Sequence, residues 1–124
     1  MPHTAGPVIL IIDDAIYVSN RIKELIGEMP DVSAVHSASE LVHALSSIQK
    51  YSPAVIILEM HFGGNVGREI FQFIKSEYPL VKIIIASNKA TADYRQRSLD
   101  SGAHGFIDKT TEFEKIPAMI RSFA

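Results

Sequence analysis

The sequence predicts an α/β fold in which a doubly wound, five-stranded parallel sheet, (βα)5, is covered by helices on both faces. Two observations predict it. Short apolar runs without alternation are typical of strands that are buried on both faces of a parallel sheet. These runs alternate along the chain with segments whose apolar residues recur at helical spacing, which favours right-handed crossovers between neighbouring strands.

The first two strand–helix units follow from this pattern. Residues 8–12 form an apolar run that stops at two aspartates, Asp13 and Asp14. The next helix is expected to end before Pro30, since the residue before a proline disfavours helical geometry. Its apolar face is predicted to consist of Val18, Ile22, Leu25, Ile26 and Met29. Residues 31–37 indicate a shorter strand with an edge-like alternation.

The second helix is expected after Ser37 or Ser39, because either hydroxyl can cap its first turn. Its predicted apolar face consists of Leu41, Val42, Leu45 and Ile48. Residues 54–58 indicate a strand buried on both faces, which leads directly into Glu59. A third helix is expected after Gly67 and before Pro79. The residues expected to face inward from it are Ile70, Phe71, Phe73 and Ile74.

The last two units complete the alternation. Residues 82–86 indicate the fourth strand, with Ser87 just beyond it, and residues 105–108 indicate the fifth, with Lys109 at its end. The helix between them, at about 90–101, has Tyr94 and Leu99 as its only large apolar side chains, so we expect it to pack loosely. Gly102 is expected to end it as a left-handed cap.

The final helix carries a conflict between two signals. Its apolar face is predicted to consist of Phe113, Ile116, Ile120 and Phe123. Thr111 and Glu114 match a capping box, which would start the helix early. Pro117 would then lie inside the helix and clash with the preceding turn. The helix is therefore expected either to begin nearer Ile116 or to bend.

Length, charge and composition limit the classes of function that this chain can have. At 124 residues we expect a single domain over 1–124, with 1–7 as an N-terminal extension. A net charge of -2 argues against direct contact with nucleic acid. No apolar run approaches the ~20 residues of a membrane span, and the first residues lack the pattern of a secretory signal. The absence of cysteine excludes zinc–thiolate sites and fits a reducing compartment. We therefore expect a cytoplasmic domain with no membrane contact.

The predicted strand ends bring polar residues together. For five such units the flavodoxin-like strand order 2-1-3-4-5 places ligands beyond the carboxyl ends of strands one and three. Asp13, Asp14 and Glu59 would converge there, with Ser87 and Lys109 on the same rim. Three carboxylates in one cleft repel one another, so they need a cation or raised pKa values to coexist. Mg2+ is a suitable cation, because it prefers oxygen ligands together with a phosphate oxygen. The lysine and the hydroxyl are suited to contact a phosphoryl group, so this edge has a phosphoryl-binding layout.

Together these residues resemble the receiver domains of bacterial two-component response regulators, over nearly the whole chain from Val8 to the last helix. The motifs that carry the resemblance are residues 11–14, Gly67 at eight positions after Glu59, Ser87, Gly102-Ala103 and residues 105–109.

The resemblance implies roles for the site residues. Metal ligands would be Asp13, Asp14, Glu59 and the backbone carbonyl of His61. Lys109 would contact the phosphoryl group, Ser87 would sense it, and Phe106 would be the aromatic switch whose rotamer follows Ser87. The implied partners are a histidine kinase or phosphotransfer protein and an output domain or effector. They would bind through the face of residues 90–124, and a homodimer through the fourth helix is a further option.

This chain departs from the family at the acceptor, where Glu59 replaces the usual aspartate. The extra methylene displaces the carboxylate, and in-line positioning governs phosphoryl transfer. Glutamate would instead resemble the phosphorylated state by placing negative charge near Ser87 and Lys109. A structural ion pair between Glu59 and Lys109 is an equally open interpretation. Two further departures are residues 62–64, where the family usually has Met-Pro-Gly, and Thr110, where it usually has proline.

We therefore predict a receiver that is not an enzyme, works independently of phosphorylation or in a locked state, and signals by protein contact with weakened Mg2+ binding. One alternative is a working Mg2+-dependent phosphoacceptor that uses Glu59 or a neighbouring acid. A flavodoxin-like electron carrier is disfavoured because residues 13–16 offer no phosphate-binding loop. A magnesium-dependent phosphatase would need a further acid–base constellation that the sequence does not supply.

Overall fold

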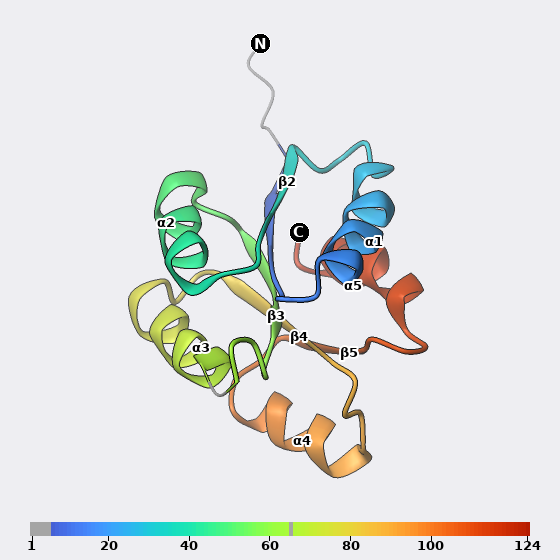
Figure 1. Cartoon of the computed structure of the whole chain (residues 1–124). Helices are drawn as coiled ribbons and strands as arrows, with labels where there is room; N and C mark the ends of the chain where they lie inside the picture. The colour runs from blue at the N-terminus through green and yellow to red at the C-terminus, as the bar shows by residue number, and fades with distance from the viewer. Residues whose placement is uncertain (1–5, 65) are drawn as a thin grey trace.

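The computed structural model describes residues 6–64 and 66–124. Its strands form a single parallel sheet in the order β2-β1-β3-β4-β5, which confirms the predicted fold class and strand order (Figure 1). The strands are β1 (Val8–Ile12), β2 (Ala34–Ala38), β3 (Val55–Glu59), β4 (Lys82–Ser87) and β5 (Gly105–Asp108).

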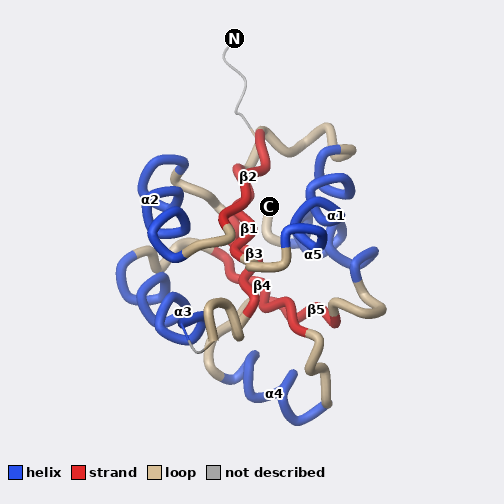
Figure 2. Tube along the Cα trace, in the orientation of Figure 1, coloured by secondary structure: helices blue, strands red, loops and turns tan. Residues whose placement is uncertain are grey.

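Helices cover both faces of this sheet. They are α1 (Ile16–Gly27), α2 (Leu41–Tyr51), α3 (Val66–Glu77), α4 (Ala92–Asp100) and α5 (Ile116–Ser122), preceded by the 3-10 turn η1 (Phe113–Lys115). In Figure 2, α1 and α5 lie together on one side of the sheet, and α2 and α3 lie on the other. No helix in the described part of the chain is long and apolar enough to cross a membrane.

The core consists of two apolar clusters, one on each face of the sheet. Alternate side chains of one strand enter different clusters: Ile56 packs towards α2 and α3, whereas Ile57 packs towards α1 and α5. Both side chains are essentially inaccessible to solvent. Burying an aliphatic side chain of this size contributes about 1.5–3 kcal/mol. The continuous apolar runs in the sequence are therefore required by burial on both faces.

Two predicted helix faces are wrong in part. In α2 the buried residues are Ala44, Ser47 and Ile48, whereas the side chains of Leu41, Val42 and Leu45 are 41%, 80% and 39% exposed. The residues of α2 that face the sheet are thus two small ones, Ala44 and Ser47, beside Ile48. The predicted serine cap is also wrong, because Glu40 precedes the helix without a side-chain cap hydrogen bond.

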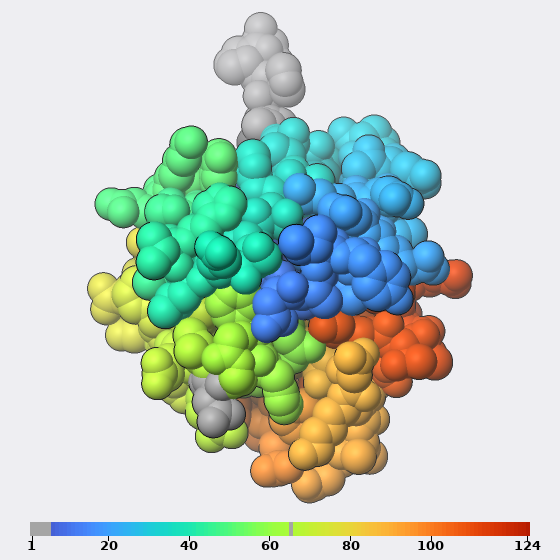
Figure 3. All heavy atoms as spheres, in the orientation of Figure 1, coloured from blue at the N-terminus to red at the C-terminus, as the bar shows by residue number. Residues whose placement is uncertain are grey.

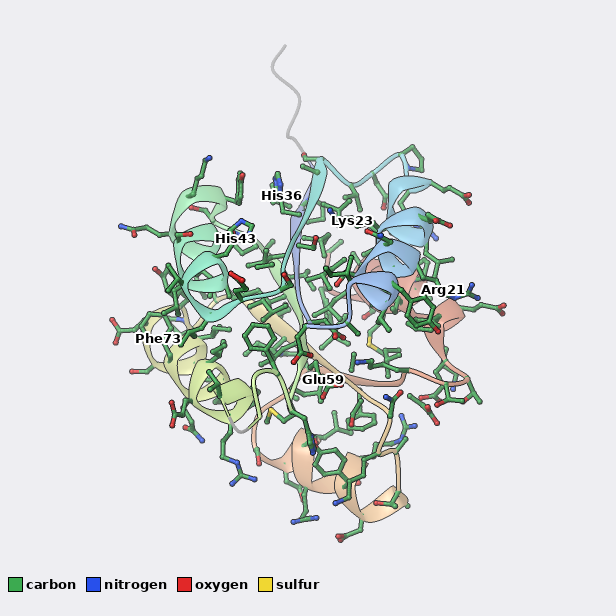
Figure 4. The ribbon with its side chains drawn as sticks, viewed as in Figure 1. Arg21, Lys23, His36, His43, Glu59 and Phe73 are labelled. Atoms are coloured by element: carbon green, nitrogen blue, oxygen red, sulfur yellow. The ribbon has the colours of Figure 1, made fainter. Side chains whose placement is uncertain are left out.

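In α3, Ile70, Phe71 and Ile74 are buried as predicted, but Phe73 is 41% exposed. The inward face of α3 is already filled by the other three, so Phe73 packs edge-to-face on Tyr78 at the surface (Figure 4).

The C-terminal elements settle the remaining expectations. Gly102 adopts a φ of 111°, as predicted for a left-handed cap after α4. Ile116 begins α5 and Pro117 lies in its first turn, where a missing N–H is harmless. Of the two options for this helix, the late start is therefore correct. The capping box is not formed, since the residue before η1 makes no side-chain cap hydrogen bond.

Candidate functional site

Four predicted residues meet at the carboxyl edge of the sheet. Asp13 follows β1, Glu59 ends β3, Ser87 ends β4, and Lys109 follows β5. Parallel pairing aligns these ends, since Glu59 is level with Ala86 and Ser87 with Asp108. Figure 4 shows Glu59 at this edge, between the sheet and α4. Strand register alone therefore brings together residues that are far apart in the sequence.

Gly67 shapes the loop that follows Glu59. A Cβ at this position would overlap the carbonyl oxygen of Met60, because the start of α3 passes directly over the end of β3. The Gly67 N–H donates to the Phe62 carbonyl at 3.1 Å and closes the loop. This close approach explains physically why a residue without a side chain stands at a fixed spacing from Glu59.

Lys109 binds two carboxylates at once. Its Nζ lies 2.7 Å from Oδ2 of Asp13 and 2.7 Å from Oε1 of Glu59, and it donates a hydrogen bond to each. The three side chains are 4%, 2% and 9% exposed in the order lysine, aspartate, glutamate. We call this arrangement of Asp13, Glu59 and Lys109 the ion triad. Short charge-assisted hydrogen bonds of this kind are roughly twice as strong as neutral ones.

The other carboxylate oxygens of the ion triad also have donors. Oδ1 of Asp13 accepts the Ala15 N–H at 2.8 Å, and Oε2 of Glu59 accepts the His61 N–H at 2.9 Å. Each of the four oxygens is therefore hydrogen-bonded. With both acids ionised and the lysine protonated, the ion triad carries a buried net charge of about -1.

Burial and hydrogen bonding shift the pKa values of Asp13 and Lys109 in opposite directions. Burial raises the pKa of Asp13, although its hydrogen bonds to Lys109 and Ala15 act in the other direction. Burial alone would lower the pKa of Lys109, but the hydrogen bonds to Asp13 and Glu59 outweigh it, and this pKa is raised. Lys109 is therefore a protonated ammonium at neutral pH and holds both acids.

The residues predicted as metal ligands do not fit Mg2+ in this arrangement. Asp14 is exposed, and its Oδ2 accepts the Gly63 N–H at 3.3 Å. The His61 carbonyl accepts the Gly64 N–H at 3.0 Å. Within residues 6–64 and 66–124, no three His, Cys, Asp or Glu side chains cluster as a metal site. Magnesium binding stays a prediction, and it requires the contacts of Lys109 to be exchanged for contacts to the ion.

The predicted switch residues lie beside the ion triad. Ser87 is buried, and its Oγ accepts the Lys89 N–H at 3.0 Å. Phe106 is also buried and packs edge-to-face on Tyr94, with ring centroids 5.7 Å apart. Burial raises the pKa of Tyr94, and the charge of Glu59 raises it further. Tyr94, which the sequence marked only as a packing residue, is therefore an electrostatic neighbour of the site.

A polar cluster that the sequence did not reveal holds α4 to the segment after β5. The Arg95 guanidinium lies 2.7 Å from Oε1 of Glu112, donates to the Phe106 carbonyl at 3.3 Å, and lies 4.8 Å from the centre of the Phe106 ring. Lys115 and the Asp108 N–H also bind Glu112. The pKa of Glu112 is lowered to about 2, chiefly by Lys115 and then by Arg95.

Comparison with known proteins identifies the family. The family model described as the response regulator receiver domain matches residues 9–121. The signal receiver domain of a two-component response regulator from Bacteroides fragilis superimposes with a TM-score of 0.84 at 24% identity, covering 97% of each chain. A signal receiver domain from Vibrio parahaemolyticus gives a TM-score of 0.82 at 18% identity, covering 95% of this chain and 89% of that one. These two likenesses concern the fold.

Curated relatives are longer than this chain. The protein-glutamate methylesterase/protein-glutamine glutaminase of Pyrococcus abyssi is 26% identical over 111 residues, which cover 88% of this chain and 30% of that protein. The fimbriae Z protein of Salmonella typhimurium is 26% identical over 108 residues, or 87% of this chain and 51% of that protein. The chain thus spans about a third to half of the length of these relatives.

Proposed function

We propose, since this chain belongs to the response regulator receiver domain family of two-component signalling, that it is a receiver whose output does not depend on phosphorylation. The proposed module extends over residues 1–124 and acts by contact with other proteins. Membership in this family favours that role over the electron-carrier and phosphatase alternatives.

The observation that carries the proposal is the closed ion triad. An acceptor carboxylate must hold an oxygen in line with phosphorus and the leaving group, so the direction in which its oxygens are held matters. In this chain one oxygen of Glu59 is bound by the Lys109 ammonium and the other by the His61 N–H. Both contacts draw electron density from the carboxylate, and the ammonium that would contact an incoming phosphoryl group is already occupied.

The same contacts support a constitutive state. The longer side chain of Glu59 brings its carboxylate within 2.7 Å of the Lys109 ammonium, and the charge of Glu59 also raises the pKa of Tyr94. In this proposal the fixed charge takes the place of the transient charge that phosphorylation would supply. No step requires Mg2+, and the domain itself has no enzymatic activity.

The proposed output face is formed by residues 90–124, which include α4, β5 and α5. Ser98 is the only residue of α4 that is buried, so α4 is held by the Arg95–Glu112 ion pair instead of by a broad apolar stripe. Polar contacts of this kind depend on one geometry, so they fix the surface that a protein partner would meet. The partner classes we propose are a histidine kinase or phosphotransfer protein and an output domain or effector.

Intact-mass spectrometry after incubation with acetyl phosphate and Mg2+ tests the proposal. The native protein and Glu59→Asp are compared, because the variant restores the shorter acceptor. We expect no phosphoryl adduct on the native chain and an adduct on Glu59→Asp. An adduct on the native chain would make Glu59, or a neighbouring acid, a working acceptor and would refute the proposal.

A further inference from the structure

A basic hollow lies between α3, α4 and the loop after β3, outside the ion triad. It has a volume of about 220 Å3 and is lined by Met60, His61, Arg68, Lys89, Tyr94 and Arg97. A second hollow of about 180 Å3 shares four of these residues and extends along α3 towards the buried Ser98. Figure 3 shows the yellow-green segment after β3 lying against the orange α4 on this side of the molecule. We call the two joined hollows the basic pocket.

The basic pocket has more positive than negative charge. Among the described residues, neither Arg68 nor Lys89 forms an ion pair within 4.0 Å. Arg97 pairs with Asp93 at 3.1 Å, but both side chains are largely exposed, so this pair is weak and readily exchanged. No carboxylate lines either hollow among the described residues, and the buried Glu59 is already bound by Lys109. A negatively charged ligand would therefore meet unpaired cations from both sides.

Tyr94 lies between these cations and supplies a neutral donor. Lys89 Nζ lies 5.9 Å from the centre of its ring, and His61 packs against the ring edge-to-face at 6.2 Å. Arg68 of α3 and Arg97 of α4 line both hollows together with Tyr94, so guanidinium groups from two helices border the space beside the phenol. The phenol hydroxyl can donate a hydrogen bond to an anionic ligand.

We propose that the basic pocket binds a small molecule through a diphosphate or phosphate-ester group. Guanidinium groups donate two parallel hydrogen bonds to phosphate oxygens, and the lysine ammonium adds a point charge. Pockets that enclose a drug-sized ligand measure about 300–1,000 Å3, and each hollow here is smaller. The pocket therefore accommodates the phosphate groups and a small organic part while the remainder stays outside.

The ligand would connect two elements that otherwise share few buried contacts. Arg68 belongs to α3, Arg97 belongs to α4, and α4 has a narrow apolar face. An anion held between them would fix α4 against α3 from the side opposite the Arg95–Glu112 pair. This inference goes beyond the proposed function, because the anion can bind whether or not Glu59 is phosphorylated.

The test is a titration of the intact 15N-labelled protein with inorganic pyrophosphate, followed by backbone amide NMR. Sodium chloride keeps the ionic strength constant, because surface charges are screened by salt. We expect saturable shifts that are largest at Arg68, Tyr94 and Arg97. Shifts that are not saturable, or that are largest at Asp13 and Lys109, overturn the proposal, since the anion would then bind unspecifically or at the ion triad.

Two charge-matched variants sharpen this titration. Arg68→Gln removes a guanidinium from the basic pocket, and we expect it to weaken pyrophosphate binding by about tenfold or more. Arg121→Gln makes the same charge change in α5, where Arg121 is exposed and pairs with Asp31 at 3.6 Å. It should leave the affinity nearly unchanged. Equal weakening by both variants would mean that net charge alone attracts the anion, and it would refute the pocket.

Discussion

Lys109→Met tests how strongly the ion triad contributes to folding. Methionine keeps the length and apolar stem of lysine but removes the ammonium that lies 2.7 Å from both Asp13 and Glu59. Two buried carboxylates would then face each other without a cation. Removing one partner from a buried ion pair costs about 3–5 kcal/mol. Since small domains are stable by only about 5–15 kcal/mol, this is a large fraction of the total.

Urea denaturation followed by circular dichroism measures the effect. With a slope of about 1–3 kcal/mol per molar urea, we expect the midpoint to fall by about 2 M at neutral pH. Adding Glu59→Gln to Lys109→Met should restore part of the loss, because one buried charge fewer remains unpaired. Lys115→Met is the control: this lysine also binds a carboxylate at 2.7 Å but is 65% exposed. It should cost at most about 1 kcal/mol.

A loss for Lys109→Met as small as that of the control would refute the reasoning. It would mean that water enters the site and screens the two acids, so that the ion triad is not a closed, dry arrangement. The expected pH dependence gives an independent check. Burial already raises the pKa of Asp13. Acidification that protonates Asp13 should therefore reduce the difference in free energy of unfolding between Lys109→Met and the native protein.

Three further predictions concern the surroundings of the site. Glu112→Gln should destabilise the protein at neutral pH. The difference in thermal midpoint should vanish as the pH falls from about 4.5 to about 2, because the folded carboxylate keeps its charge down to that pKa; a constant difference would contradict this. Ile48→Ala should cost about 2–5 kcal/mol in urea denaturation and Val42→Ala under about 0.5 kcal/mol, and an equally large loss for Val42→Ala would restore the predicted face of α2. Gly67→Ala should destabilise by more than about 1 kcal/mol, since its Cβ would overlap the Met60 carbonyl, and an unchanged urea midpoint would refute that close approach.

The sequence predicted the strands well because their burial leaves a direct trace. Residues buried on both faces of a sheet must all be apolar, so Val8–Ile12 stands out with its correct limits. The sites at the strand ends followed from the same pattern, since parallel strands align their carboxyl ends. Asp13, Glu59 and Lys109 therefore met as expected, and the ion pair between Glu59 and Lys109 was one of two interpretations left open.

Helix faces and polar contacts were harder to predict. In α2, large apolar residues are exposed while Ala44 and Ser47 are buried. Hydrophobicity alone therefore assigned most of the inward face to the wrong residues. The Arg95–Glu112 pair joins residues 17 positions apart, and only the packing of α4 beside β5 brings them together. No local pattern marks such a pair. The hydrogen bond from Lys109 to Asp13 was missed for a different reason, because a metal role was assigned to that acid.

The most direct measurement is the NMR signal of the Lys109 ammonium, with its hydrogen-bond couplings to the side-chain carboxyl carbons of Asp13 and Glu59. Buried ammonium groups with fixed partners exchange protons slowly enough to be observed in this way. The closed ion triad predicts couplings to both acids that persist in an excess of Mg2+ and acetyl phosphate. Loss of either coupling when Mg2+ is added would show that the site opens to the metal, and it would contradict the closed ion triad on which the proposed phosphorylation-independent output rests.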